Sequence, residues 1–174
     1  MAISLASVKK KNLTKNDIKQ ICLLKNSFWK YGLKKQLIWF KTYIKKNDLN
    51  VLLKINDKIV GYVLLRKRTL YISKKKYIYL LFDTLIIKKN FRKKNLSKLI
   101  INFNNIIMIK EKKIGVLYCN KKLINFYLLF NWKKKKKKIL NIVDHHTSLY
   151  PLIYNLDINI KIKKLKKILV YTKS

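Results

Sequence analysis

The fold of this chain is decided by residues 77–119, which read YIYLLFDTLIIKKNFRKKNLSKLIINFNNIIMIKEKKIGVLYC. Residues 77–87 are almost continuously apolar, which is typical of a strand in the middle of a sheet. From residue 96 the apolar side chains follow a helical period, and residues 114–119 form another short apolar run. Strand, helix and strand in this order predict a right-handed crossover between two parallel strands.

Two helices are predicted upstream of this segment. Thr14-x-x-Asp17 resembles a capping box, and the apolar residues that follow it predict a helix over residues 14–26. A second apolar stripe begins at Leu33 and predicts a helix that ends near Lys46.

A hairpin is predicted between the second helix and the long strand. Residues 51–55 and 59–65 are apolar and β-branched, and Asn56-Asp57-Lys58 between them has the composition of a turn. Gly61 lies inside the second run, where a glycine marks a bulge or a close approach of another group.

The C-terminal third is predicted to add a short helix and further strands. The helix covers residues 123–130 and one strand covers residues 139–143, and one or two further strands are predicted among the apolar runs at 149–153, 158–162 and 168–171. The six-lysine run at 133–138 is interpreted as a solvated turn or the edge of a strand. Residues 1–174 therefore predict a single α/β domain with a mixed, mainly antiparallel sheet flanked by helices.

The charge is extreme but does not identify a function. The chain has 43 Lys+Arg against 7 Asp+Glu, a net charge of +36, and only three of the basic residues are Arg. Proteins that read nucleic acids favour arginine, so the lysine excess is interpreted as the composition bias of an AT-rich genome. In either case we expect non-specific attraction to polyanions at low salt.

Targeting signals and metal sites are not indicated. The apolar start of the chain is too short for a secretory signal, and no apolar run approaches the length of a membrane span. Cys22 and Cys119 are far apart with no Cys-x-x-Cys motif, and the pair His145-His146 has no third ligand near it and is interpreted as a solvated turn. We expect a cytoplasmic protein without a metal or membrane insertion.

Most familiar catalytic motifs are missing. The seven carboxylates mostly occur at caps and turns, which argues against a glycosidase or a two-metal site. The sequence also contains no Gly-x-Ser-x-Gly elbow and no glycine-rich nucleotide loop.

The remaining candidate is the junction at residues 87–99, Ile-Lys-Lys-Asn-Phe-Arg-Lys-Lys-Asn-Leu-Ser-Lys-Leu. The start of a helix exposes free backbone N–H groups at the positive end of the helix dipole, and here it is surrounded by Lys and Arg. Such a start suits a pyrophosphate. The alternative is an ordinary turn with solvated lysines.

The same stretch resembles the acyl-coenzyme A binding segment of the GCN5-related N-acetyltransferases, Val-x-Pro-x-aromatic-Arg-Gly-x-Gly-x-Gly/Ala. Ile87, Phe91 and Arg92 match the Val, the aromatic residue and the Arg. Lys89 replaces the Pro, Lys93 and Asn95 replace the first two glycines, and Ser97 occupies the last small position. Asn tolerates the left-handed conformation better than other residues with a side chain, whereas Lys does not.

A second segment extends the resemblance. Residues 114–120 and 123–132 are similar to the family's next strand and its Phe-Tyr-x-x-x-Gly-aromatic helix end, with Asn131 at the Gly and Trp132 at the aromatic residue. Residues 51–65 resemble the family's central hairpin. The resemblance covers about residues 12–132 and implies splayed parallel central strands.

The resemblance also implies the site. Backbone N–H groups at Leu85, Ile86 and Ile87 would face the thioester, and Asn120 would bond the pantetheine or the acceptor. The remaining residues expected to bind the cofactor are Arg92, Lys93, Lys94, Asn95, Leu96 and Ser97. Tyr127 is the candidate general acid, or else a packed helix residue, and Asp83 is the candidate base, or else a carboxylate neutralised by a nearby Lys. Trp29 and Trp39 are explained by helix packing.

The implied function is acetyl transfer from acetyl-CoA, as acyl donor and without a metal, to a primary amine. The acceptor is a small molecule or a protein N-terminus or lysine, and the protein is a monomer or a homodimer. One alternative is a non-enzymatic basic protein associated with RNA or ribosomes. Another is a degenerate relative that binds coenzyme A without turnover.

Overall fold

The computed structural model describes residues 2–136, 139–144, 147–156 and 167–173. The chain forms two compact units, Met1–Arg66 with Asp83–Asn104, and Lys67–Phe82 with Asn105–Ser174. Three long elements contribute residues to both: β3 (Lys58–Ile72), β4 (Lys75–Ile87) and α3 (Leu96–Lys110). The single domain over residues 1–174 stays a prediction.

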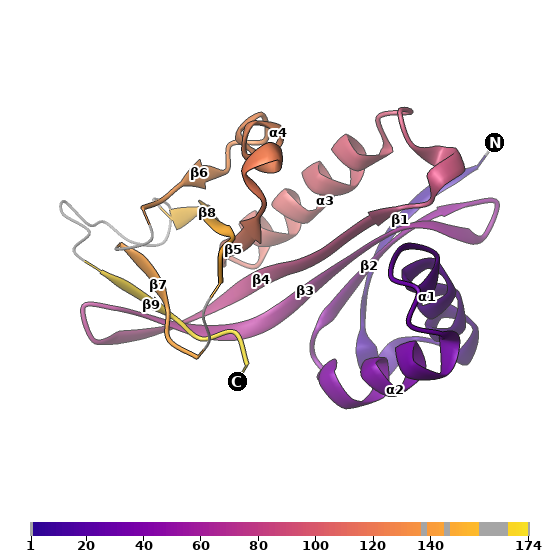
Figure 1. Ribbon diagram of the computed structural model, residues 1–174, viewed down its shortest axis with the longest axis horizontal. Coiled ribbons are helices and arrows are strands. Elements are labelled where there is room, and N and C mark those ends of the chain that lie inside the picture. The colour runs from indigo at the N-terminus through magenta and orange to yellow at the C-terminus, as the bar shows by residue number, and fades with distance from the viewer. Residues whose placement is uncertain (1, 137–138, 145–146, 157–166, 174) are drawn as a thin grey trace. The chain divides into compact units, whose positions relative to one another are not determined.

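Two helices of the first unit lie side by side, α1 (Lys15–Phe28) and α2 (Leu33–Tyr43) (Figure 1). The capping box predicted at Thr14 is confirmed, because the Asp17 N–H donates to Thr14 Oγ1 at 3.0 Å and the Thr14 N–H donates to Asp17 Oδ2 at 3.2 Å. Helix α2 ends before the predicted Lys46, since Ile44 is already extended, with φ −92° and ψ 124°.

The strands of the first unit begin with β1 (Ile3–Lys9), which pairs antiparallel with β2 (Leu49–Ile55) and is followed by the short 3-10 helix η1 (Lys10–Asn12). The sequence reading missed β1. The strand is short and its side chains are mostly exposed, so it is defined by its pairing with β2 and not by burial of an apolar face.

The predicted hairpin joins β2 to β3 and is confirmed. Its turn residues Asn56 and Asp57 have φ of 46° and 61°, as a two-residue turn between antiparallel strands requires. The bulge expected at Gly61 is present, because the register shifts between the pairs Leu53↔Gly61 and Lys54↔Ile59. Strand β3 continues beyond the predicted end to Ile72 and turns into β4 through Ser73 and Lys74.

The core of the first unit joins α1 and α2 to the sheet. Side chains from both helices, from β2, β3 and the end of β4 form one buried cluster, which contains Ile21, Cys22, Leu24, Phe40, Ile44, Leu52, Ile59, Tyr62, Leu64 and Ile86. Each fully buried large side chain of this kind contributes about 1.5–3 kcal/mol. This packing fixes the positions of α1 and α2 against β3 and β4.

In the second unit the predicted crossover is confirmed as parallel. Strand β4 pairs with β5 (Ile114–Cys119) from Tyr79↔Ile114 to Phe82↔Leu117. After β5 come the short 3-10 helix η3 (Lys121–Leu123) and the helix α4 (Ile124–Leu128), where a helix over 123–130 was expected. Asn131, which stands at the Gly of the family pattern, has φ 62° and is therefore in the left-handed conformation common after the end of a helix.

The remaining strands are short: β6 (Lys133–Lys134), β7 (Leu140–Ile142), β8 (Tyr150–Tyr154) and β9 (Ile168–Val170). Strand β8 pairs antiparallel with β5 and β6, and β9 pairs antiparallel with β3 and parallel with β7. The apolar run at 158–162, one of the three among which one or two strands were predicted, lies outside the described residues. The predicted mixed, mainly antiparallel sheet flanked by helices is confirmed.

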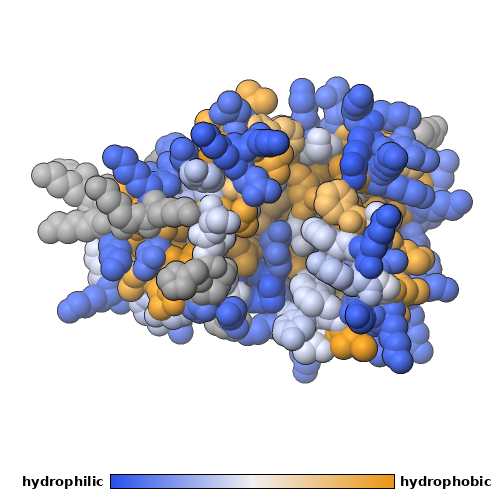
Figure 2. Space-filling view, in the orientation of Figure 1, coloured by the Kyte–Doolittle hydropathy of each residue, from blue (hydrophilic) through white to orange (hydrophobic). Residues whose placement is uncertain are grey.

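The start of the lysine run is a strand edge, one of the two predicted alternatives, because Lys133 and Lys134 are exposed and pair with Ile153 and Leu152. Figure 2 shows hydrophilic residues over much of the visible surface. Both cysteines are buried and free. Within the described ranges no helix has the length and apolar character needed to cross a bilayer.

Candidate functional site

The connection from β4 to α3 adopts the geometry of a glycine-rich turn without glycine. After Ile87 the chain forms the short 3-10 helix η2 (Lys89–Phe91) and then enters α3 through Lys93, with φ 61°, and Asn95, with φ 56°. These two residues stand where the family pattern has glycines, and their backbones adopt the left-handed conformation that glycine adopts without strain. The turn therefore has positive φ at both positions without a glycine at either.

The N-terminus of α3 is open. The carbonyl of Asn95 accepts the N–H of Leu99 at 3.1 Å, whereas the N–H groups of Leu96, Ser97 and Lys98 donate to no acceptor among the described residues. The first turn of α3 contains no acidic side chain. Free N–H groups at the positive end of a helix dipole attract anions.

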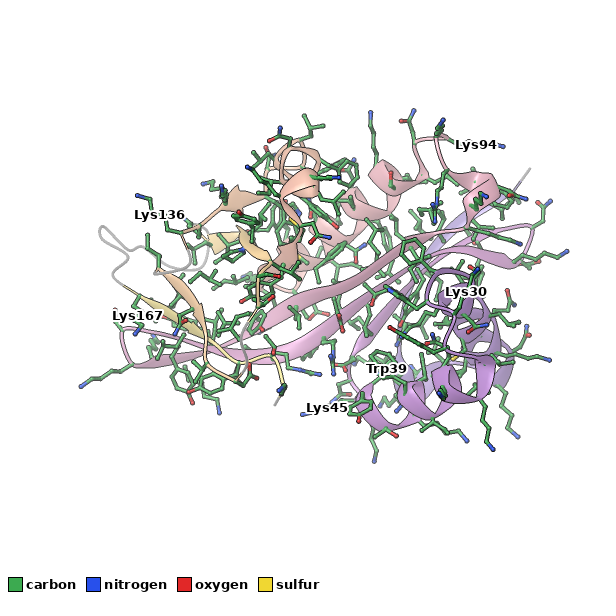
Figure 3. The ribbon with its side chains drawn as sticks, in the orientation of Figure 1. Lys30, Trp39, Lys45, Lys94, Lys136 and Lys167 are labelled. Atoms are coloured by element: carbon green, nitrogen blue, oxygen red, sulfur yellow. The ribbon has the colours of Figure 1, made fainter. Side chains whose placement is uncertain are left out.

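Arg92 stabilises the loop between β4 and α3 through two contacts. Its Nε donates to the carbonyl of Ile87 at 3.0 Å, and its guanidinium lies 5.3 Å from the centroid of the Phe28 ring. Lys93 and Lys94 are exposed, and Figure 3 shows Lys94 on the loop before α3. The residues expected to bind a diphosphate, from Arg92 to Ser97, thus form one continuous, basic helix start.

The end of β4 leads into this loop. The parallel ladder with β5 ends at Phe82↔Leu117, while β4 itself continues to Ile87. Ile86 and Ile87 are buried, and Leu85 is half-buried. A Cβ at Gly61 would lie 2.8 Å from Ile87 Cδ1, so the glycine allows the close approach that its position predicted.

Asp83, the candidate base, is neutralised by an arginine rather than by a lysine. Arg66 Nη1 donates to Asp83 Oδ2 at 3.1 Å, and Arg66 Nη2 donates to the carbonyl of Tyr43 at 2.9 Å. The carboxylate of Asp83 therefore lies in an ion pair that is fixed to the end of α2.

Asp83 also lines a pocket of about 370 Å³ in the first unit, together with Thr84 and residues of α1, α2 and the turn between them. The walls are aromatic, with Trp29, Tyr31 and Trp39. In Figure 2 pale residues of intermediate hydropathy gather over α1 and α2, where Figure 3 labels Trp39.

Lys25 is the unusual residue of this pocket. It is only 5% exposed, and its Nζ lies 3.2 Å from the centroid of the Trp39 ring and 5.9 Å from that of Trp29. Burial lowers the pKa of Lys25 to about 8; Asp83 and Cys22 act to raise it, and Arg66 acts to lower it. Sequence reasoning missed Lys25. The available signal was a lysine on the apolar face of α1, near Ile21 and Cys22.

The candidate acid Tyr127 lies in the second unit, on α4, and is 6% exposed. Its ring makes edge contacts with Phe82, Phe126 and Trp132, with centroids 6.0, 5.3 and 6.3 Å away. Burial, with a smaller contribution from Cys119, raises the pKa of Tyr127 well above its usual range, so the phenol keeps its proton at neutral pH. Asn120 is exposed at the start of η3.

Trp132 closes the end of α4, and its Nε1 donates to Asn105 Oδ1 at 3.2 Å. His145 and His146 lie outside the described residues. Among the residues that are described, no group of three or more His, Cys, Asp or Glu side chains is arranged to hold a metal ion.

No protein-family model and no curated protein matches this chain. Solved structures do match it. ElaA of Escherichia coli has a TM-score of 0.64 at 11% identity, with 87% of this chain and 99% of that chain covered. An acyl-CoA N-acyltransferase from Pseudomonas aeruginosa has a TM-score of 0.62 at 7% identity, with 87% and 97% covered.

The PaiA N-acetyltransferase of Thermoplasma acidophilum, solved in complex with coenzyme A, has a TM-score of 0.55 at 15% identity, with 88% of this chain and 98% of that chain covered. At such low identity these matches show a common fold. The resemblance to the GCN5-related N-acetyltransferases is therefore confirmed at the level of the fold, which is that of the N-acyltransferases.

Proposed function

We propose that this chain is an N-acyltransferase that uses acetyl-CoA as acyl donor and a primary amine as acceptor. The observation that carries the proposal is the start of α3, where consecutive N–H groups are free and the loop before them keeps the left-handed geometry at Lys93 and Asn95. Its fold, shared with N-acyltransferases, supports the same conclusion.

The start of α3 suits the diphosphate of coenzyme A. Free N–H groups and the helix dipole favour a ligand with several negative oxygens, and Arg92, Lys93 and Lys94 add positive charge beside them. No carboxylate in the first turn competes for these groups.

The reaction requires no metal. The amine attacks the thioester carbonyl, the new amide bond forms as the C–S bond breaks, and backbone N–H groups near Leu85–Ile87 stabilise the oxyanion. Asp83 accepts a proton from the acceptor ammonium directly or through water, so that the neutral amine can attack. Tyr127 gives its proton to the departing thiolate, and the proton that the amide nitrogen loses restores the phenol. These roles follow the residue-by-residue resemblance to the family.

Two measurements test the proposal. Acetyl-CoA at millimolar concentration should raise the melting temperature of the purified protein, because a ligand of the native state stabilises it. A set of amine acceptors should then produce free thiol from acetyl-CoA. Stabilisation without thiol release from any acceptor would favour a degenerate coenzyme A binder, and no stabilisation would contradict the proposal.

Replacing Tyr127 with Phe tests the acid. The Tyr127→Phe variant should keep its melting temperature, because the ring contacts remain, while kcat falls by about 100-fold or more. Unchanged turnover would reduce Tyr127 to a packing residue.

A further inference from the structure

The pocket between α1, α2 and the end of β4 carries more positive charge than its own residues neutralise. Lys25 and Lys35 line it, and the carboxylate of Asp83 is already paired with Arg66 at 3.1 Å. The pocket is therefore suited to an anionic group.

Lys25 is the positively charged residue with which an anionic ligand would form an ion pair in this pocket. The residue is 5% exposed, its Nζ lies against the face of Trp39, and it takes part in none of the ion pairs found among the described residues. The face of Trp39 stabilises the ammonium in part, because the ring quadrupole attracts a cation. A buried ammonium is costly unless it is paired, and a carboxylate supplied by a ligand would pair it.

The remaining walls define the body of this ligand. Trp29, Tyr31 and Trp39 provide flat apolar surface, and the volume of about 370 Å³ lies in the range of small-molecule sites. The turn that carries these walls is held in place, because Gln36 Nε2 donates to the Trp29 carbonyl at 3.1 Å and the Gly32 N–H donates to Asn26 Oδ1 at 2.8 Å.

We propose that this pocket binds a small organic carboxylate with an aromatic or large apolar body, with the carboxylate on Lys25 Nζ and the body against Trp29 and Trp39. The inference rests on the proposed function in one respect: in the transferase this ligand also carries the acceptor amine, so the acceptor class is an aromatic or apolar amino acid.

The binding test uses the change in tryptophan fluorescence of the full chain without acetyl-CoA, since Trp29 and Trp39 line the pocket and Trp132 is not among its lining residues. The probes are 3-phenylpropanoate, its neutral analogue 3-phenylpropanamide, and phenethylamine, measured at high salt so that the +36 net charge does not attract anions non-specifically. We expect saturable binding of the carboxylate, with affinity about 10- to 100-fold above that of the amide and the amine. Equal affinity for the three probes would overturn the proposal.

A variant pair locates the contact. Lys25→Met keeps an unbranched side chain of nearly the same length and removes its charge, and it should lose about 10- to 100-fold in affinity for 3-phenylpropanoate. Lys19→Met removes the same charge from an exposed position of α1 and should bind like the parent protein. Equal loss in both variants, or no loss in Lys25→Met, would overturn the assignment. The comparison of probes in the parent protein decides the question even if Lys25→Met does not fold.

A further experiment with L-phenylalanine distinguishes failure of this inference from failure of the proposed function. L-phenylalanine carries the carboxylate, the ring and an amine, so it should bind through Lys25 and release thiol from acetyl-CoA. Binding without thiol release would remove the role as acceptor and leave the pocket assignment intact. The absence of both would overturn the pocket assignment, and acetyl-CoA stabilisation would still test the transferase separately.

Discussion

Helices α1 and α3 begin in opposite ways within the same unit. At the start of α1 the chain closes its own helix, because Thr14 and Asp17 exchange hydrogen bonds of 3.0 and 3.2 Å between side chain and backbone. At the start of α3 the backbone enters through Asn95 with φ 56°, and the N–H groups of the first turn have no acceptor among the described residues.

The difference shows how one carboxylate closes a helix start in this protein. Carboxylates are scarce, with seven in the chain against 43 Lys and Arg residues, and Asp17 closes α1. The first turns of α2 and α3 contain none, and at α3 the left-handed residues Lys93 and Asn95 also precede the helix. Leaving α3 without a cap forgoes about 1 kcal/mol of stability, which is consistent with N–H groups kept for an anionic ligand.

The largest expected effect comes from closing the start of α3. Ser97→Asp places a carboxylate in the first turn, where it should add about 0.3–1 kcal/mol to the unfolding free energy through the helix dipole. The same carboxylate repels a diphosphate, so the affinity for acetyl-CoA should fall by at least about 10-fold. Denaturant unfolding and calorimetric titration measure the two effects.

The informative result is that Ser97→Asp raises the unfolding free energy and at the same time lowers the affinity for acetyl-CoA. Asn102→Asp introduces the same charge on an exposed position in the middle of α3 and should change neither quantity by a comparable amount. If Ser97→Asp binds acetyl-CoA as tightly as the parent protein, the open helix start is not the diphosphate site.

Local patterns predicted most of this fold. The capping box at Thr14, the Asn56-Asp57 turn and the almost continuous apolar run of β4 each encode their structure within a few residues, and all were correctly predicted. The left-handed Asn95 was predicted in the same way, because asparagine is the common substitute for glycine there.

What the sequence did not reveal depends on neighbours far away in the chain. Strand β1 forms because its backbone pairs with that of β2, and its own side chains are mostly exposed. Lys25 reads as one lysine among many until α2 brings Trp39 to within 3.2 Å of its Nζ and both lie beside Asp83 in the pocket. Pairing and burial of this kind come from tertiary structure, which a local pattern does not record.

Opening the start of α1 is the reverse experiment and has a smaller effect. Thr14→Ala should cost about 1 kcal/mol of unfolding free energy and leave acetyl-CoA affinity unchanged, since this helix start binds its own carboxylate. Burial alone would raise the pKa of Asp17, but the hydrogen bonds from Thr14 and Lys54 outweigh it and hold the pKa below 3.8.

The lowered pKa of Asp17 determines how its contribution to protein stability depends on pH. A carboxyl with a lowered folded-state pKa stabilises the protein above its unfolded pKa, and this contribution is lost as the pH falls through the folded value. The stability difference between the parent protein and Thr14→Ala should therefore narrow below about pH 4. A difference that stays constant down to pH 2 would mean that the Asp17 carboxylate does not take part in the cap.

The smallest effect concerns the strain that remains at the start of α3. Lys93 has φ 61°, a conformation that costs a residue with a Cβ about 1 kcal/mol. Lys93→Gly removes this strain but gives the unfolded chain more freedom, so a net gain of about 0.5 kcal/mol is expected. Lys94→Gly removes the same charge at the adjacent residue, which has no positive φ, and this variant should be less stable than the parent protein.

Since both variants lose one positive charge beside the N–H groups of α3, any difference in their acetyl-CoA affinity reports the shape of the turn and not its charge. Equal stability of the two variants would show that the left-handed turn at Lys93 is not strained.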